Sequence, residues 1–436
     1  MPFLIVSTLE AYVKKRRNVM AEVKLKKGFS LTTLILIGTI GGIVFGSLVG
    51  PWTANLKFIG DIFIRLIQMS VVLLVMTAVS SAIAKMDVGA GKMAFHTFKW
   101  ILGFTVLSAF LGLALGLIIR PGEGITVVAA ENIGALAVNT SIPQTLLGFV
   151  PTNVIGAMAS GAMIPCILFS IFFGAALGLY TRSSGKTVML EMVESLNGVI
   201  MNIIKIVMKI APIGIFCLLA HVSGEIGFRV IIPMGKFLGA LLIGVIIQFL
   251  LYFPLGAMLC KVNPLKMPKK FAKMSIMALT TTSSAICLPT KMEDMVTKFG
   301  ISRRATDFTG PITMSMNANG AVMCYVLAIL FMSQSTGIVL GPYELGMAIL
   351  LSILMCMGTI VVPGGMVVTY TFLATSLGLP IESIAVLIGI DWFSGVFRTL
   401  MNVDVDVLVG MLVSGKMGDL DRDVYNGTKT VEYNQG

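Results

Sequence analysis

Residues 389–406 read GIDWFSGVFRTLMNVDVD and place charged side chains inside a strongly apolar part of the chain. A charge at the centre of a bilayer costs about 2.5–3.5 kcal/mol on insertion scales, so such residues usually mark a functional site. At about 100° per residue, five residues fall within roughly 80° on one helix face: Asp391, Gly395, Arg398, Asn402 and Asp406. Asp404 falls on the opposite side. The alternative is a structural pair of Asp391 with Arg398, which would leave Asn402 and Asp406 unexplained.

Composition sets the class of the whole chain. It has 436 residues, of which 56% are hydrophobic and 12% charged, and its mean hydropathy is +0.94. Soluble domains carry about 25% charged residues. Apolar stretches of spanning length, about 17–25 residues, recur along the chain without the alternation of a β-barrel. We therefore expect an all-α polytopic membrane protein.

Charge and cysteine content indicate how the chain is oriented in the membrane and what its cysteines do. The net charge of +11 comes largely from loops, and a basic cluster at residues 14–27 precedes the first span. The positive-inside rule then predicts that the N-terminus lies in the cytoplasm. We expect a protein of the inner (plasma) membrane whose partners include lipids and exclude nucleic acid. The six cysteines stand singly in or beside apolar segments, as packing residues do.

Two apolar segments in the second half of the chain are interrupted. The hydroxyl run at residues 280–284 has flanks too short to cross a bilayer, and Pro-Gly-Gly at 363–365 divides residues 345–379. Irregular backbone at membrane depth must be buried in protein or line a cavity. A pair of broken segments predicts a transporter site formed by two re-entrant hairpins. The alternative is a kinked helix at Pro363 and a serine-rich packing seam.

The remaining chain is expected to form further helices and one external loop. A polar stretch at 120–141 predicts an external loop, residues 150–180 predict a broken helix, and Pro212 is expected to kink the helix at 190–221. The other expected helices are residues 31–50, 56–84, 93–119 and 230–259.

Six motifs in order carry a family resemblance: VPTNVIGAMASG at 150–161, APIGIF at 211–216, TSSAICLP at 282–289, NANG at 317–320, VPGG at 362–365, and the polar face of the last helix. Over residues 31–413 the chain resembles the dicarboxylate/amino acid:cation symporter family, the glutamate-transporter homologues. The resemblance implies eight transmembrane helices, two re-entrant hairpins, inverted repeats, a homotrimer and an elevator-type transporter.

The resemblance also implies a domain division. Scaffold helices would stay fixed while a transport domain carries substrate across the membrane. The expected segments are a cytoplasmic tail (1–28), scaffold helices 1–2 (29–92), transport-domain helix 3 with an external loop (93–142), scaffold helices 4–5 (143–228), the rest of the transport domain (229–415), and a C-terminal tail (416–436).

The expected substrate site centres on Arg398, whose planar fork suits a carboxylate. Asp391 would orient it, the first hairpin tip would offer hydroxyl and backbone N–H donors, and glycines would let the second tip move. The predicted set is Ser283, Ser284, Ala321, Val362, Gly364, Gly365, Asp391, Gly395, Arg398, Thr399 and Asn402.

Sodium is the coupling ion that the resemblance implies, and no other cofactor is expected. One site would use Asp406, Asn402 and Asn317 with carbonyls near Thr313. A second would use carbonyls of the second hairpin near Met357 and Thr359, together with Ser315.

Departures from the family pattern bear on the substrate. Gly395 stands where amino-acid transporters of the family have an Asp that holds the ammonium group, and Asn319 replaces the signature Asp. Phe104 occupies the place of a third-site hydroxyl, while Ala321 and Met366 reshape the pocket. A buried ammonium without a counter-carboxylate costs several kcal/mol. We therefore expect a small dicarboxylate such as succinate, fumarate or malate, with an acidic or neutral amino acid as the alternative, and fewer coupled cations.

An anion channel and a membrane-embedded enzyme are the alternatives from other functional classes. An anion-conducting channel would need a continuous polar lining rather than two occluding hairpins. An enzyme would need a nucleophile–base pair or a metal cluster, and His96 and His221 lie far from every polar motif. The expected function is secondary symport coupled to sodium or protons, not catalysis.

Overall fold

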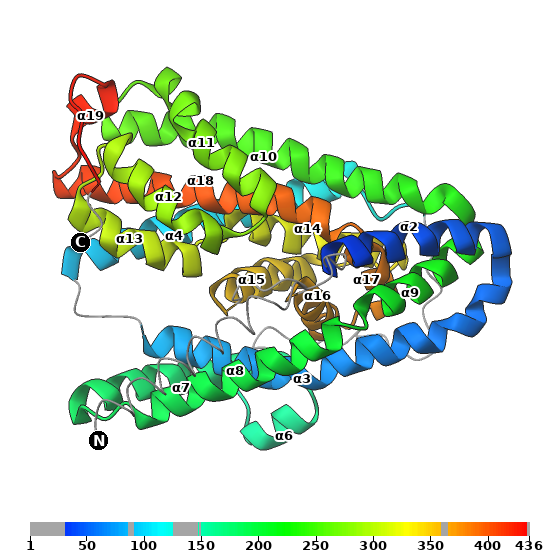
Figure 1. Ribbon diagram of the computed structural model, residues 1–436. Coiled ribbons are helices and arrows are strands. Elements are labelled where there is room, and N and C mark those ends of the chain that lie inside the picture. Colours follow the sequence, from blue (N-terminus) through cyan, green and yellow to red (C-terminus); the bar gives the residue numbers. More distant parts are fainter. Residues whose placement is uncertain (1–30, 86–90, 125–146, 148–149, 359–364, 434–436) are drawn as a thin grey trace, which may run out of the picture.

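The computed structural model describes residues 31–85, 91–124, 147, 150–358 and 365–433 (Figure 1). Within these ranges every regular element is a helix, which confirms the all-α prediction. The α-helices are α2 (Leu31–Val49), α3 (Lys57–Ala84), α4 (Gly91–Ile119), α6 (Val154–Ala159), α7 (Met163–Ser184), α8 (Val188–Met208), α9 (Ala211–Ile226), α10 (Ile231–Cys260), α11 (Met267–Thr281), α12 (Ser284–Thr297), α13 (Arg303–Met316), α14 (Asn319–Ser335), α15 (Pro342–Gly358), α16 (Gly365–Ser376), α17 (Ile384–Gly389), α18 (Asp391–Met417) and α19 (Arg422–Asn426).

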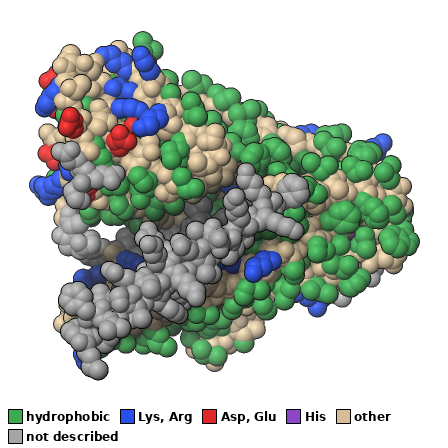
Figure 2. All heavy atoms as spheres, in the orientation of Figure 1, with side chains coloured by type: hydrophobic (Ala, Val, Ile, Leu, Met, Phe, Trp, Pro, Cys, Tyr) green, Lys and Arg blue, Asp and Glu red, His purple; other side chains and the backbone are tan. Residues whose placement is uncertain are grey.

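Several of these helices are long and apolar enough to cross a membrane. Five such stretches occur among the described residues: Thr33–Ser81, Gly91–Ile119, Pro165–Ser184, Ala211–Cys260 and Arg303–Ser335. Along α10, Leu242, Ile246 and Leu250 are exposed at a spacing of four residues, as on a helix that faces lipid. Figure 2 shows hydrophobic side chains over much of the surface and charged ones gathered at the end that carries α19. The protein is a multi-pass membrane protein, and the count of eight transmembrane helices stays a prediction.

The helices pack in two groups. One contains α2, α3, α7, α8 and α9, and the other contains α4, α10, α11 to α14 and α18, with α15 to α17 between them (Figure 1). In the first group α2 lies very close to α9. A Cβ added at Gly38, Gly42 or Gly46 would lie 2.5, 2.6 or 2.2 Å from a backbone oxygen of α9. This stripe of glycines lets two membrane helices meet at backbone distance.

The segment around Pro212 differs from the prediction. We expected one helix over residues 190–221 with a kink, but α8 ends at Met208 and α9 begins at Ala211. Pro212 falls in the first turn of α9. A missing N–H costs nothing there, because the first N–H groups of a helix have no intrahelical acceptor. The proline therefore starts a new helix. The predicted break within residues 150–180 is present between α6 and α7, where Gly161 has a φ of +69°.

The first interrupted segment forms two short helices, α11 and α12, which pack against each other. Thr282 ends α11 in the left-handed region with a φ of +49°. Ser283 is extended and caps α12, its Oγ accepting a hydrogen bond of 3.4 Å from the N–H of Ile286. We call α11, residues 282–283 and α12 hairpin 1.

The second interrupted segment corresponds to α15 and α16. The residues that join them, 359–364, lie outside the described residues, and the predicted site positions Thr359, Val362 and Gly364 lie there too. Downstream of hairpin 1, a further break at residues 317–318 separates α13 from α14. It brings the polar NANG motif to a point where two helices end.

The C-terminal tail packs against the ends of α10 and hairpin 1. The Tyr425 hydroxyl donates to the carbonyl of Asn263 over 2.8 Å, and Arg422 Nε donates to that of Cys260 over 3.0 Å. Burial raises the pKa of Tyr425 to about 12, so the hydroxyl remains a neutral donor. The sequence offered no motif in this tail, and the structure shows that α19 is hydrogen-bonded to the end of α10 and the residues after it.

Candidate functional site

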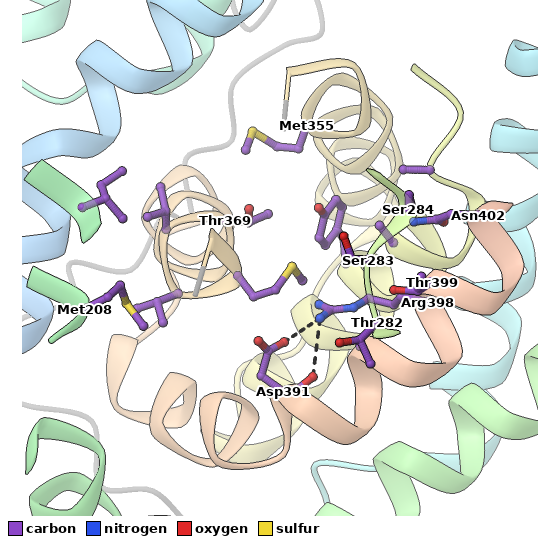
Figure 3. Close-up of a pocket in the computed structure, with 18 of the residues that line it drawn as sticks. Met208, Thr282, Ser283, Ser284, Met355, Thr369, Asp391, Arg398, Thr399 and Asn402 are labelled. Atoms are coloured by element: carbon purple, nitrogen blue, oxygen red, sulfur yellow. Dashed lines mark hydrogen bonds and ion pairs between the residues drawn. The ribbon is translucent and has the colours of Figure 1, made fainter. Parts of the chain in front are cut away.

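A cavity of about 410 Å³ lies between the two groups of helices (Figure 3). One wall comes from α2, α3 and α8 and is almost entirely apolar, with Asn197 as its polar residue. The opposite wall comes from hairpin 1, α14, α16 and α18 and carries hydroxyls, an amide and a buried ion pair. The charged lining residues are therefore confined to one side of the cavity.

The centre of the polar wall is Arg398 on α18. Its side chain is buried, and its Nη2 donates to Asp391 Oδ1 over 2.7 Å (Figure 3). The two residues are seven positions apart, which is two helical turns, so the same face of α18 carries both. The Nη1 atom of Arg398 has no hydrogen-bond partner among the described residues. A buried donor without a partner is costly, and an anionic ligand would satisfy it.

The tip of hairpin 1 lies beside this guanidinium. Thr282, Ser283 and Ser284 line the cavity, and Figure 3 shows them close to Arg398. The first N–H groups of α12 lie at this tip, and a helix N-terminus carries a partial positive charge. The tip and Arg398 therefore place a helix N-terminus and a guanidinium side by side in the cavity wall.

Three further residues of α18 complete the polar wall. Thr399 and Asn402 line the cavity, and Asn402 Oδ1 accepts the backbone N–H of Gly320 over 2.9 Å. At Gly395 an added Cβ would lie 3.3 Å from Arg398 Nη2, so a side chain there would contact the guanidinium. The structure thus brings together eight predicted substrate residues: Ser283, Ser284, Ala321, Asp391, Gly395, Arg398, Thr399 and Asn402.

The second interrupted segment contributes to the cavity through α16. Met366 and residues 367–369 line the cavity. Gly365 begins α16, whereas Val362 and Gly364 fall outside the described residues. The role of these three positions stays a prediction.

The predicted first sodium site contains a residue that the sequence analysis missed. Asn317 Nδ2 donates to Asp406 Oδ1 over 2.9 Å, as expected of neighbours in one site. The other carboxylate oxygen, Asp406 Oδ2, lies 2.6 Å from the ammonium of Lys291 on α12. In the sequence Lys291 is followed by Glu293 and Asp294, a pattern typical of a solvated helix face. Nothing local marks it as buried.

The remaining oxygen atoms of this predicted site are also engaged. Asn317 Oδ1 accepts from Asn319 Nδ2 over 2.5 Å, and Asn402 Oδ1 accepts from Gly320 as described above. Sodium needs several oxygen lone pairs directed at one point. With the ammonium of Lys291 on Asp406, the residues as arranged here do not fit a sodium ion.

The second predicted sodium site is only partly described. Ser315 Oγ donates to the carbonyl of Pro311 over 3.1 Å, and Met357 lies in the last turn of α15. Thr359 lies outside the described residues. At the position associated with a third site, Phe104 packs against Tyr252 with ring centroids 4.7 Å apart. In the described part of the chain no group of three or more His, Cys, Asp or Glu residues could hold a metal ion.

A cavity with a buried guanidinium in its wall, between two groups of membrane helices, is an arrangement typical of membrane transporters. The sequence profile of the sodium:dicarboxylate symporter family matches residues 31–416, and the chain belongs to this family. The predictions of this family and of transport rather than catalysis are confirmed.

Similar proteins carry two kinds of name. The chain is 29% identical over 392 residues to a "Proton/glutamate-aspartate symporter" of Bacillus subtilis (strain 168), covering 87% of this chain and 93% of that protein. It is 27% identical over 401 residues to "C4-dicarboxylate transport protein 1" of Mesorhizobium japonicum, covering 89% and 83%. It is 29% identical over 403 residues to a "C4-dicarboxylate transport protein" of Agrobacterium fabrum, covering 89% and 88%.

Proposed function

We propose that the protein is a secondary active symporter that takes up a small dicarboxylate, such as succinate, fumarate or malate, together with sodium or protons. One observation carries this proposal. Arg398, held by Asp391 in a cavity wall, keeps a buried donor that has no partner among the described residues. A carboxylate placed between Arg398 and the tip of hairpin 1 would supply the missing acceptor.

The residues around the cavity favour a substrate without an amino group. Among the lining residues that the structure describes, Asp391 is the one carboxylate, and it is paired with Arg398. A substrate ammonium in this cavity would lack a free acidic partner and would pay for its desolvation. The names of the relatives include both dicarboxylates and acidic amino acids, so an acidic or neutral amino acid is the second candidate.

The uneven walls of the cavity support an elevator mechanism. The apolar wall of α2, α3 and α8 contains no charged lining residue among those described, so a polar domain can slide past it without breaking ion pairs. In this mechanism residues 29–92 and 143–228 stay fixed, and residues 93–142 and 229–415 move. The proposal includes a homotrimer in the inner membrane with its N-terminus in the cytoplasm.

Uptake into proteoliposomes tests this function. Radiolabelled succinate is offered with an inward sodium gradient, with an inward proton gradient, or with neither, and fumarate, malate, aspartate and alanine are added as competitors. The expected result is concentration of succinate above the external level under one gradient, with stronger competition by fumarate and malate than by aspartate.

The same assay separates the alternatives. Accumulation that only aspartate or alanine competes for would favour amino-acid transport. A channel would let the solute equilibrate and would never concentrate it. Equilibration without accumulation under both gradients would overturn the symport proposal.

A further inference from the structure

Lys291 is a buried cation at the point where the family resemblance places a sodium ion. It lies on α12, the second helix of hairpin 1, and its side chain is 1% exposed. Its partner Asp406 lies on α18, 115 positions later in the sequence, and is equally buried. Hairpin 1 and α18 thus meet through an ion pair sealed from solvent.

All three protons of the ammonium have oxygen partners. Nζ of Lys291 donates to Asp406 Oδ2 over 2.6 Å, to the carbonyl of Gly310 over 3.0 Å, and to Thr313 Oγ1 over 3.5 Å. A lysine ammonium has three donors and no acceptor, so this set satisfies it completely. A carboxylate, a carbonyl and a hydroxyl around one positive charge are also the groups that would surround a bound alkali cation.

We infer that Lys291 permanently replaces a coupling cation at Asp406, so that this position binds no sodium. The inference rests on the proposed symport function and specifies which ion site takes no part in coupling. The charge that a mobile ion would bring and release is instead attached to hairpin 1.

Electrostatics exclude both cations at once. A sodium ion on Asp406 would stand within a few ångströms of the ammonium, and like charges repel strongly in a buried site. The neighbouring amides offer little in place of the carboxylate. Asn317 Nδ2 donates to Asp406 and Asn317 Oδ1 accepts from Asn319 Nδ2, which leaves Asn319 Oδ1 as the one amide oxygen of this pair without a partner among the described residues. Sodium could bind Asp406 only if the ammonium of Lys291 left its carboxylate.

The replacement has a consequence for energy coupling. With this position filled by the protein, the driving ion must bind elsewhere, and fewer ions accompany each substrate than in a relative that binds sodium here. The charge on Asp406 is neutralised in every state of the transport cycle. Folding of hairpin 1 against α18 at this point then needs no sodium.

Thermal unfolding of the purified protein in detergent, followed by tryptophan fluorescence, tests the inference without any substrate. Wild type, Lys291→Ala, Lys291→Met/Asp406→Asn and the control Lys273→Ala are each measured in sodium chloride and in choline chloride of equal concentration. Lys273 lies in the same hairpin, and its side chain is 55% exposed. We expect Lys291→Ala alone to gain a sodium-dependent rise in the midpoint, of about 2 °C or more, beyond the wild-type response.

Each outcome decides the question. The double variant has no charge left to neutralise, so it should respond to sodium as wild type does, and so should Lys273→Ala. If Lys291→Ala responds as wild type does, or if the double variant gains the same sodium effect, the inference is wrong. If Lys291→Ala does not fold in choline but folds in sodium, that also supports it. Should it fold in neither salt, the double variant decides, and a sodium requirement there would overturn the inference. Because no substrate is present, failure of the dicarboxylate proposal would leave this result readable.

Discussion

Helix α18 carries two ion pairs that differ in how completely the protein satisfies them. Arg398 pairs with Asp391 beside a cavity, where Asp391 is 23% exposed and one guanidinium nitrogen has no described partner. Asp406 pairs with Lys291 in a sealed position where both side chains are 1% exposed and every ammonium proton has an acceptor. The same helix thus holds one ion pair with an unused donor and one ion pair whose donors are all used.

The difference separates binding from charge compensation. An ion pair with an unmet donor gains free energy when an anion arrives, so it can recognise a ligand. A pair whose donors are all used gains nothing from a further ion. Removal of one partner of such a pair leaves an uncompensated buried charge. Burial of a charge in a membrane protein therefore does not by itself indicate a binding site.

The largest effect is expected from removing Arg398, the cation of the ion pair that has an unused donor. Arg398→Ala deletes the anion receptor, and uptake of labelled dicarboxylate into proteoliposomes should fall about 30-fold or more. Arg398→Lys keeps the charge without the planar fork and should be intermediate. Arg303→Ala, an exposed arginine on α13, is the control. Undiminished uptake by Arg398→Ala would remove this residue from the site.

The next largest effect is expected from neutralising the acid of each pair, which should lower the free energy of unfolding by different amounts. Asp406→Asn strands the ammonium of Lys291 in a sealed position and should lower the free energy of unfolding by about 3–5 kcal/mol. Asp391→Asn should cost clearly less, because water in the cavity can solvate Arg398. Chemical denaturation in detergent measures both. Equal losses would mean that the two environments do not differ as described.

A smaller effect is expected at Gly395. An Asp there would begin with a Cβ 3.3 Å from Arg398 Nη2, so its carboxylate would share the guanidinium and offer an ammonium a partner. Competition by aspartate relative to succinate should improve about tenfold in Gly395→Asp. Gly395→Ala adds the Cβ without the charge and should leave the ratio unchanged. An unchanged ratio in Gly395→Asp would show that the missing acid does not set selectivity.

The smallest effect concerns a third carboxylate on α18. Asp404 is fully buried and its Oδ2 accepts from Ser275 Oγ on hairpin 1 over 2.7 Å, while its Oδ1 has no partner among the described residues. Ser275→Ala should lower the free energy of unfolding by about 1–3 kcal/mol. Thr280→Ala, an exposed hydroxyl on the same helix, should change little. If both variants lose the same amount, the contact with Asp404 contributes nothing specific.

Local patterns predicted much of the fold and the residues of hairpin 1 and α18 that line the cavity. The spacing of Asp391 and Arg398 on one helix predicted their pairing, because residues two turns apart share a face. The interrupted segment at 280–284 predicted hairpin 1, since short apolar flanks cannot span a bilayer. The length of residues 190–221 misled us, because a proline that fits a first helical turn looks the same as one that kinks a helix.

The sequence alone determined that this is a helical membrane transporter, and it predicted that one face of its last long helix binds a carboxylate. Those features follow from hydropathy and from helix periodicity, which act over a few neighbouring residues. Only the tertiary structure decided that Lys291 occupies the predicted cation position at Asp406. The two residues are 115 positions apart, and their pairing depends on how hairpin 1 folds against α18. No local pattern encodes such a long-range contact, since it arises from the packing of separate helices.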